Sequence, residues 1–293
     1  MVFEILIKKS NKMNIIRPNS AFFITLWSLL PFVFLSAFTF IPQPTETNAD
    51  KEQFAYRKMS NQAFGFNEKL SYRVHYGVIN AAAVTMEVGP QFIEKSDRKC
   101  YQIKADGRTL KSFDWAYKVR DKFESYVDNE ALAPISYNKS VQEDKYVDSD
   151  LVNFKHHKKK LYGVKGVLDM PEYTHDIISA LYYVRNLDFS NAKKGDKYPV
   201  DIYLDNKIYH LGFKYDGKET ISTDIGKIKC LRFVPILVVD RVFKDQDDMT
   251  VWVSDDANKI PIRVKAKIMV GSIKADITSY SGLKNEFKAL VSK

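Results

Sequence analysis

Histidines and cysteines are the side chains most often found in metal sites and nucleophilic sites. This chain of 293 residues has five histidines and two cysteines. No two histidines have the H-x-x-x-H spacing that places both imidazoles on one face of a helix. Cys100 and Cys230 each follow a lysine and have no histidine near them in the sequence to act as a base. The sequence therefore predicts no metal site, no cofactor and no cysteine nucleophile.

The two cysteines have a second possible role. In an oxidising compartment Cys100 and Cys230 could form a disulfide, which would stabilise the fold by about 2–4 kcal/mol. The other interpretation is two independent thiols. The local patterns leave both interpretations open.

The sequence contains only weak evidence for a serine nucleophile or for catalytic carboxylates. Gly271-Ser272-Ile273 lacks the second glycine of a G-x-S-x-G elbow and is typical of a hairpin turn. Asp121 stands between Val119 and Phe123 at a position where the strand pattern calls for an apolar residue. A charge there either pairs with an arginine inside the sheet or faces a cavity. A carboxylate-dependent hydrolase is thus a lesser alternative, and we expect a protein that is not an enzyme.

Aromatic residues are the stronger signal for binding. Several of them share the inward side of predicted strands, where they could line a lumen for an acyl chain or another apolar ligand. A packed core would use the same residue types. The candidate lumen residues are Trp115, Tyr117, Phe123, Tyr209, Phe213 and Tyr215, together with Leu181 of a predicted helix.

Alternation of apolar and polar residues dominates the chain after position 68. Leu70, Tyr72, Val74 and Tyr76 alternate with polar residues, and six or more later segments repeat this habit. One apolar and one charged face indicate an antiparallel sheet with one wet side. Residues 176–187 have helical spacing, and residues 61–68 give a second, weaker helical signal. We therefore predict one mainly β domain over 68–293: an open antiparallel barrel, or a strongly curved sheet, covered by one helix.

The first 49 residues have the order of an export signal. A basic stretch ends at Arg17, residues 21–41 carry no charge, and a polar segment with small residues follows up to Ala49. The uncharged run is longer than most signal cores, so cleavage near Ala49 and retention as a membrane anchor both stay open. Residues 50–67 are predicted to be a polar tether. The remainder is expected outside the cytoplasm, in the periplasm or cell envelope.

Three short motifs in this order suggest a family. They are residues 119–128 (VRDKFESYVD), residues 181–185 (LYYVR), and residues 250–256 (TVWVSDD) followed by 260–264 (IPIRV). Together they make the chain resemble the bacterial domain of unknown function 3108. The resemblance implies an exported envelope protein without an assigned reaction. Its expected open barrel with a helix is similar in shape to lipoprotein carriers, which hold acyl chains in a half-barrel.

The net charge and the predicted location limit the kinds of molecule that this protein could bind. The net charge is +9, and it is about +7 after residue 49, with acidic and basic residues interspersed. This charge favours weak attraction to anionic lipid or glycan, and an exported location excludes nucleic acid. The predicted function is non-catalytic binding of a lipid, a lipoprotein acyl chain or an envelope partner. Contact with the membrane would come through the N-terminal segment if that segment is uncleaved. The alternative is a structural or interaction module of envelope assembly with a filled core.

Overall fold

The computed structural model describes residues 54–239, 242–245, 249–267 and 271–292. The predicted export segment and its cleavage region, residues 1–49, lie outside the described residues. In the described part, the chain forms one α-helix, α3 (Ile177–Val184), a short 3-10 helix, η1 (His156–Lys158), and a seventeen-stranded antiparallel sheet. Helix α3 has only eight residues, and no described helix has the length and apolar character needed to cross a membrane.

The strands follow the predicted alternation. Their bounds are β1 (Lys69–Tyr76), β2 (Ile79–Val88), β3 (Ile93–Lys95), β4 (Arg98–Thr109), β5 (Arg120–Asp128), β6 (Pro134–Glu143), β7 (Tyr146–Lys155), β8 (Lys160–Gly163), β9 (Gly166–Asp169), β10 (Lys197–Leu204), β11 (Lys207–Thr223), β12 (Gly226–Val239), β13 (Val242–Asp245), β14 (Met249–Ser254), β15 (Pro261–Lys267), β16 (Ser272–Ser281) and β17 (Leu290–Ser292).

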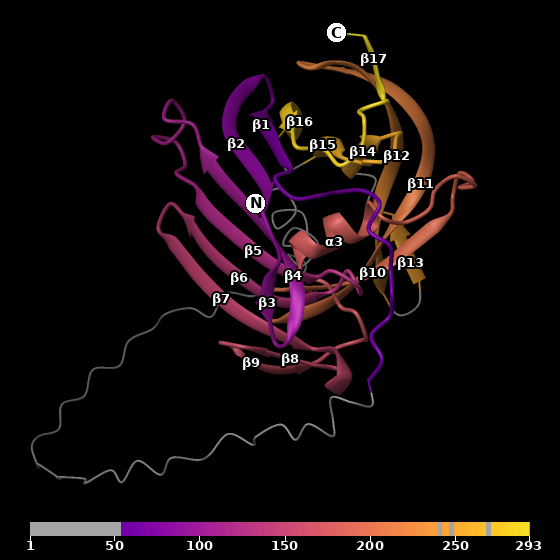
Figure 1. Cartoon of the computed structure of the whole chain (residues 1–293). Helices are drawn as coiled ribbons and strands as arrows, with labels where there is room; N and C mark the ends of the chain where they lie inside the picture. The colour runs from indigo at the N-terminus through magenta and orange to yellow at the C-terminus, as the bar shows by residue number, and fades with distance from the viewer. Residues whose placement is uncertain (1–53, 240–241, 246–248, 268–270, 293) are drawn as a thin grey trace, which may run out of the picture.

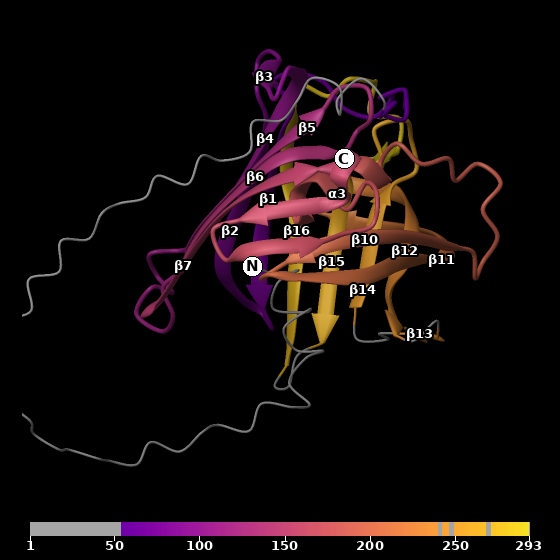
Figure 2. The same ribbon diagram turned by 90° about the horizontal axis from the view of Figure 1, so that it is seen from below.

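The sheet is a long curved meander with two free edges. From β9 the neighbours run β8, β7, β6, β5, β4, β2 and β1, and then β16, β15, β14, β12, β11 and β10. The short strands β3, β13 and β17 pair beside β4 and β12. Helix α3 lies inside the curve of the sheet (Figures 1 and 2). The predicted open barrel or curved sheet with one helix is confirmed.

Side chains, and not a ladder of backbone hydrogen bonds, bridge β10 to the β7–β8 edge. The hydroxyl of Tyr203 on β10 donates to Asp150 Oδ2 on β7 at 2.5 Å. Lys139 on β6 pairs with Asp205, just beyond β10, and with Asp148 on β7. We call these side chains the seam. The backbone of His175 also bonds to β10, since its N–H donates to Asp201 and its carbonyl accepts from Tyr203.

The segment before β1 is part of the folded domain. Phe64 is 1% exposed, and its ring contacts Tyr182 of α3 at a centroid distance of 4.8 Å. The Met59 N–H donates to the Glu130 carbonyl. The predicted tether over 50–67 is therefore wrong for residues 59–67, because Ala63 and Phe64 fill space under α3 that the sheet leaves open.

Candidate functional site

An apolar cavity of about 140 Å³ lies between α3 and the inner face of the sheet. A smaller space of about 30 Å³ adjoins it, because both are lined by Leu181, Val251 and Pro261. The hydroxyl of Tyr72 donates to the Pro261 carbonyl at 3.0 Å, so this polar atom on the wall is already satisfied. The cavity is lined by Tyr72, Val84, Met86, Ala105, Gly107, Phe123, Ile177, Ile178, Leu181, Val251, Pro261, Val264 and Ala275.

Small inward-facing residues create the space. Gly107 on β4 pairs with Val84 on β2, and Ala275 on β16 pairs with Val264 on β15. A Cβ placed on Gly107 would have its nearest neighbours, atoms of Asp121 and Val84, at 3.9 Å. Such distances are ordinary contacts, so the wall at Gly107 has room for a larger side chain. Leu181 on α3 faces this wall from the other side of the cavity.

The N-terminal end of α3 is held by a buried capping box. Asp176 accepts hydrogen bonds from the N–H groups of Ile178 and Ser179, and the Ser179 hydroxyl accepts from the Asp176 N–H. This pattern satisfies backbone donors that a helix start leaves unpaired. Ser125 of β5 donates to the second oxygen of Asp176 at 2.6 Å. The cap therefore joins the helix to the sheet. It also sets the helix start one residue after the predicted 176.

A buried ion pair holds the other end of α3. Arg185 donates to both carboxylate oxygens of Glu68 at 2.7 and 2.8 Å, and the two side chains are 3% and 0% exposed. The Arg185 guanidinium also donates to the carbonyls of Ala63 and Asn258. Its five donors suit such a forked arrangement. With both ends fixed, α3 forms a rigid floor for the cavity, and the space beneath it is filled.

The predicted lumen residues have three different fates. Phe123 and Leu181 line the cavity, and Phe213 lines the smaller space next to it. Tyr215 is buried against Phe233 at a centroid distance of 5.5 Å, outside both spaces. Tyr209 is half-buried on the side of β11 that carries Phe213 and Tyr215.

Trp115 and Tyr117 do not line a lumen, and their prediction is wrong. They are 86% and 45% exposed. The prediction placed Tyr117 at the start of a strand. In the structure, residues 110–117 form successive turns, and β5 begins only at Arg120. A turn has no alternating inner face, so these aromatic rings point outward.

Most of the cavity wall was not among the predicted site residues. Val84, Ala105 and Ala275 stand on the inward side of their strands, as the alternation predicts, and Gly107 lies on the same side of β4, beyond the predicted pattern. The small side chains among them contribute to the cavity by leaving space unfilled. A search for aromatic rings finds the filled part of an interior, whereas a cavity is found where small residues face one another.

Asp121 is 1% exposed, and its Oδ1 accepts a hydrogen bond from the Gln142 N–H at 3.3 Å. It faces the inside of β5, behind Gly107. The placement agrees with its position in the alternation. Its role stays a prediction.

Cys100 and Cys230 are both free and buried, so the possible disulfide does not form. Cys100 lies on β4 and Cys230 on β12, with β2, β1, β16, β15 and β14 between them in the sheet. Burial raises the pKa of each thiol to about 12. Both groups are therefore protonated at neutral pH and poor nucleophiles.

Two buried imidazoles lie outside the cavity, near the N-terminal segment. The Nε2–H of His156 donates to the Pro134 carbonyl at 2.8 Å, and burial lowers the pKa of this imidazole to about 4. Burial also holds the pKa of His175 well below its usual value, and Arg57 lies 3.5 Å from its Nε2. In the described part of the chain, no three histidine, cysteine or acidic side chains are grouped as a metal site would require.

This fold and cavity define a class: an open antiparallel β-barrel with one internal helix and an apolar space beside that helix. The chain belongs to the protein family of unknown function DUF3108, whose sequence profile matches residues 71–278. No curated protein matches the chain.

Three solved structures are similar to the chain at low identity. A β-barrel-like protein of the domain of unknown function DUF1849 from Brucella abortus has a TM-score of 0.48 and 10% identity, covering 76% of this chain and all of that one. A candidate lipoprotein from Parabacteroides distasonis has a TM-score of 0.32, 10% identity and 78% coverage of this chain. An exported-protein candidate with a YmcC-like fold from Bacteroides fragilis has a TM-score of 0.33, 11% identity and the same coverage. The last two are also covered over their full length.

Proposed function

We propose that this protein is a non-catalytic protein of the cell envelope that holds the end of an acyl chain, or an apolar group of similar size, in the cavity beside α3. The observation that carries the proposal is an apolar cavity of about 140 Å³ whose one wall hydroxyl, that of Tyr72, is already bonded. An apolar cavity of about 150 Å³ in another protein stays free of water and binds benzene. The cavity is smaller than the ~300–1,000 Å³ of sites that enclose a whole small molecule.

The proposed location rests on the sequence. Residues 21–41 carry no charge and follow a basic stretch, which is the order of an export signal or an anchor. In either case the barrel would work outside the cytoplasm, where acyl chains of lipids and lipoproteins are available. Fractionation of the native host, with the N-terminus of the product determined by mass spectrometry, tests both the compartment and cleavage near Ala49.

The cavity is tested by filling it. In Gly107→Val, the added methyl groups enter the cavity, and a β-branched residue suits a strand. The matched control is Gly65→Val. It adds the same volume outside the cavity, at a position where an added Cβ would first meet the flexible Lys284 side chain at 3.6 Å. Thermal unfolding checks that both variants fold.

Native mass spectrometry of the full chain, purified from its own membranes, provides the readout. We expect a lipid mass on the wild type and on Gly65→Val, and its loss from Gly107→Val. Binding of a fatty acid with a fluorescent polyene tail should follow the same order. Absence of lipid from all three proteins, or equal retention by all three, would contradict the proposal.

A structural module with a filled core is the second candidate, and one observation favours it. Below α3 the interior is solid, because Arg185, Glu68 and Phe64 are buried there in direct contact. If the protein is such a module, Gly107→Val should not change the amount of lipid that copurifies with it. Crosslinking in the native envelope should then recover the protein that the module binds.

A further inference from the structure

Exposed apolar side chains gather at one end of the barrel. Four connections, β1–β2, β4–β5, β6–β7 and β8–β9, each carry one large apolar side chain that is more than 70% exposed, in the turn or at the start of the next strand: Val78 (98%), Trp115 (86%), Val147 (73%) and Val164 (75%). We call residues 76–79, 115–117, 146–147 and 162–167 the apolar rim. Among the described residues, the exposed large apolar side chains outside the rim are Phe92, Leu151 and Val291, at 36%, 49% and 54%.

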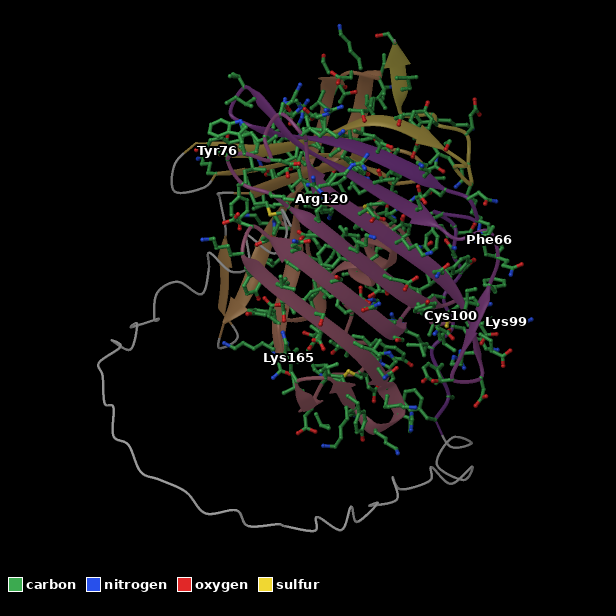
Figure 3. All side chains as sticks on the ribbon, turned by 90° about the vertical axis from the view of Figure 1, so that its left-hand side faces the viewer. Phe66, Tyr76, Lys99, Cys100, Arg120 and Lys165 are labelled. Atoms are coloured by element: carbon green, nitrogen blue, oxygen red, sulfur yellow. The ribbon has the colours of Figure 1, made fainter. Side chains whose placement is uncertain are left out.

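The four parts of the rim lie at the same end of the barrel. Its four connections join strands that are successive neighbours in the sheet, and in an antiparallel meander alternate connections lie at the same end. Tyr76 and Lys165 lie toward this end, while Phe66, Lys99 and Cys100 lie toward the opposite end (Figure 3). Gly107 of the cavity wall is two residues from the rim end of β4, or roughly 7 Å along the strand.

Aromatic rings accompany the apolar side chains. Tyr76, Trp115, Tyr146 and Tyr162 place at least one tyrosine or tryptophan at each connection, and all four are exposed. The Trp115 Nε1–H donates to the Ser112 carbonyl at 3.0 Å within its own loop. The indole can therefore enter an apolar medium without losing a hydrogen bond. Tryptophan and tyrosine are the residues enriched where proteins meet the membrane–water interface.

A belt of positive charge lies on the outer face just behind the rim. Lys265 stands directly opposite Lys274 in the β15–β16 register, and like charges placed so destabilise a sheet. Arg73 on β1 occupies the neighbouring row, beside Asp276. We call Arg73, Arg108, Lys122, Arg263, Lys265 and Lys274 the basic belt; with Asp106 and Asp276 on the same face, its net charge is +4.

Two carboxylates next to the rim are engaged in ion pairs. Asp114 accepts from Arg120, and Asp148 pairs with Lys139 and Lys165. Glu143 and Asp144, at the β6–β7 connection, are two further acidic residues at this end. The end of the barrel thus presents separate apolar tips in front and positive charge behind them. This order matches the hydrocarbon boundary and the phosphate level of an anionic bilayer.

We propose that the apolar rim and the basic belt dock the barrel, mouth first, onto the surface of an anionic phospholipid bilayer. A protein partner fits less well, because the apolar side chains are isolated tips along an arc and form no single concave patch. The inference does not rest on the proposed function, since no rim residue lines the cavity. Docking would, however, bring the end of β4 that carries Gly107 of the cavity wall toward the acyl chains of the bilayer.

The test uses a fluorophore placed on the rim of the full chain. Val78→Cys can be labelled selectively with an environment-sensitive dye, because Cys100 and Cys230 are buried and their pKa values are raised to about 12. Lys99→Cys, at the opposite end, is the matched control (Figure 3). The vesicles contain phosphatidylglycerol and phosphatidylethanolamine, with pure phosphatidylcholine vesicles as the uncharged comparison.

We expect the dye at position 78 to shift to the blue with anionic vesicles and to be quenched by a lipid-borne quencher, while the dye at 99 stays unchanged. Trp115→Ser with Val147→Ser should raise the lipid concentration needed by about tenfold, since two apolar anchors are lost. Gly107→Val should leave docking intact, which separates this proposal from the cavity.

Three outcomes would overturn the proposal. First, the dye at position 78 could stay unchanged with anionic vesicles. Second, the dyes at 78 and 99 could respond equally, which is the result expected if the protein bound through residues 21–41 alone. Third, the dye at 78 could respond only to a soluble envelope protein. The last result would identify the rim as a protein interface.

Discussion

Two buried histidines, His156 and His175, make the stability of the protein depend on pH. His156 is 0% exposed, with the charged groups Arg57 and Asp128 and the ring of His157 around it. Burial lowers its pKa from 6.5 to about 4, so the unfolded chain binds a proton that the folded chain rejects between these values. The folded state is therefore favoured above pH 6.5 and loses stability as the pH falls toward 4.

We predict a loss of about 2 kcal/mol from His156 alone between pH 7.5 and pH 5. Burial lowers the pKa of His175 as well, so it adds to the loss in the same direction. Urea unfolding at both pH values should show a smaller loss in His156→Gln, which has no titrating ring. His210→Gln, at an exposed position, is the control, and an identical pH dependence of the two variants would contradict the prediction.

At the scale of elements, α3 positions the cavity, and the Glu68–Arg185 pair holds α3. Breaking one partner of a buried pair leaves an uncompensated charge inside the protein. We predict that Glu68→Gln lowers the free energy of unfolding by about 3–5 kcal/mol. The double variant Glu68→Leu with Arg185→Met should lose much less, because neither charge remains buried.

The neighbouring pair Lys69–Glu87 is the control for this prediction. Its nitrogen and oxygen are 2.7 Å apart, but the side chains are 54% and 45% exposed. Glu87→Gln should therefore cost less than about 1 kcal/mol. Similar losses in Glu68→Gln and Glu87→Gln, measured by urea denaturation, would show that the buried pair does not anchor the helix.

At the scale of the whole molecule, the seam is where the barrel is least tightly closed. Side chains bridge β10 to the opposite edge of the sheet, and Tyr203 and Asp150 are its most buried pair, at 1% and 3% exposed. Asp150 Oδ1 has no hydrogen-bond partner among the described residues. The Tyr203 hydroxyl is therefore a critical donor to this buried carboxyl group.

We predict that Tyr203→Phe costs about 1–3 kcal/mol, because it leaves a buried carboxyl group without this donor. Hydrogen exchange should quicken in β7, β8 and β10 and remain unchanged in β4 and β5, since local opening begins where the fewest backbone bonds hold. Tyr162→Phe removes the same hydroxyl at an exposed site and should change neither quantity. Uniform acceleration over all strands would count against a weak seam.

The strands could be predicted from the sequence because the alternation of apolar and polar residues is a property of each strand alone. Leu70, Tyr72 and Val74 are buried on β1 and the residues between them are not, as the pattern requires. The same rule failed at Trp115 and Tyr117, where a run of turns precedes β5 and no strand defines an inner side. The helix 177–184 was found because its spacing differs from that of every strand around it.

The amino-acid sequence by itself determined the family, the antiparallel barrel, the single helix and the alternation that assigns each strand residue to an inner or outer face. The tertiary structure alone decided that Gly107 and Ala275 leave a cavity, that Cys100 and Cys230 stay apart, and that exposed side chains of four separate connections form one rim. The reason is that a pattern along the chain reports which way a side chain points. Empty volume and a shared surface depend on which strands meet, and this follows from pairings between residues far apart in the chain.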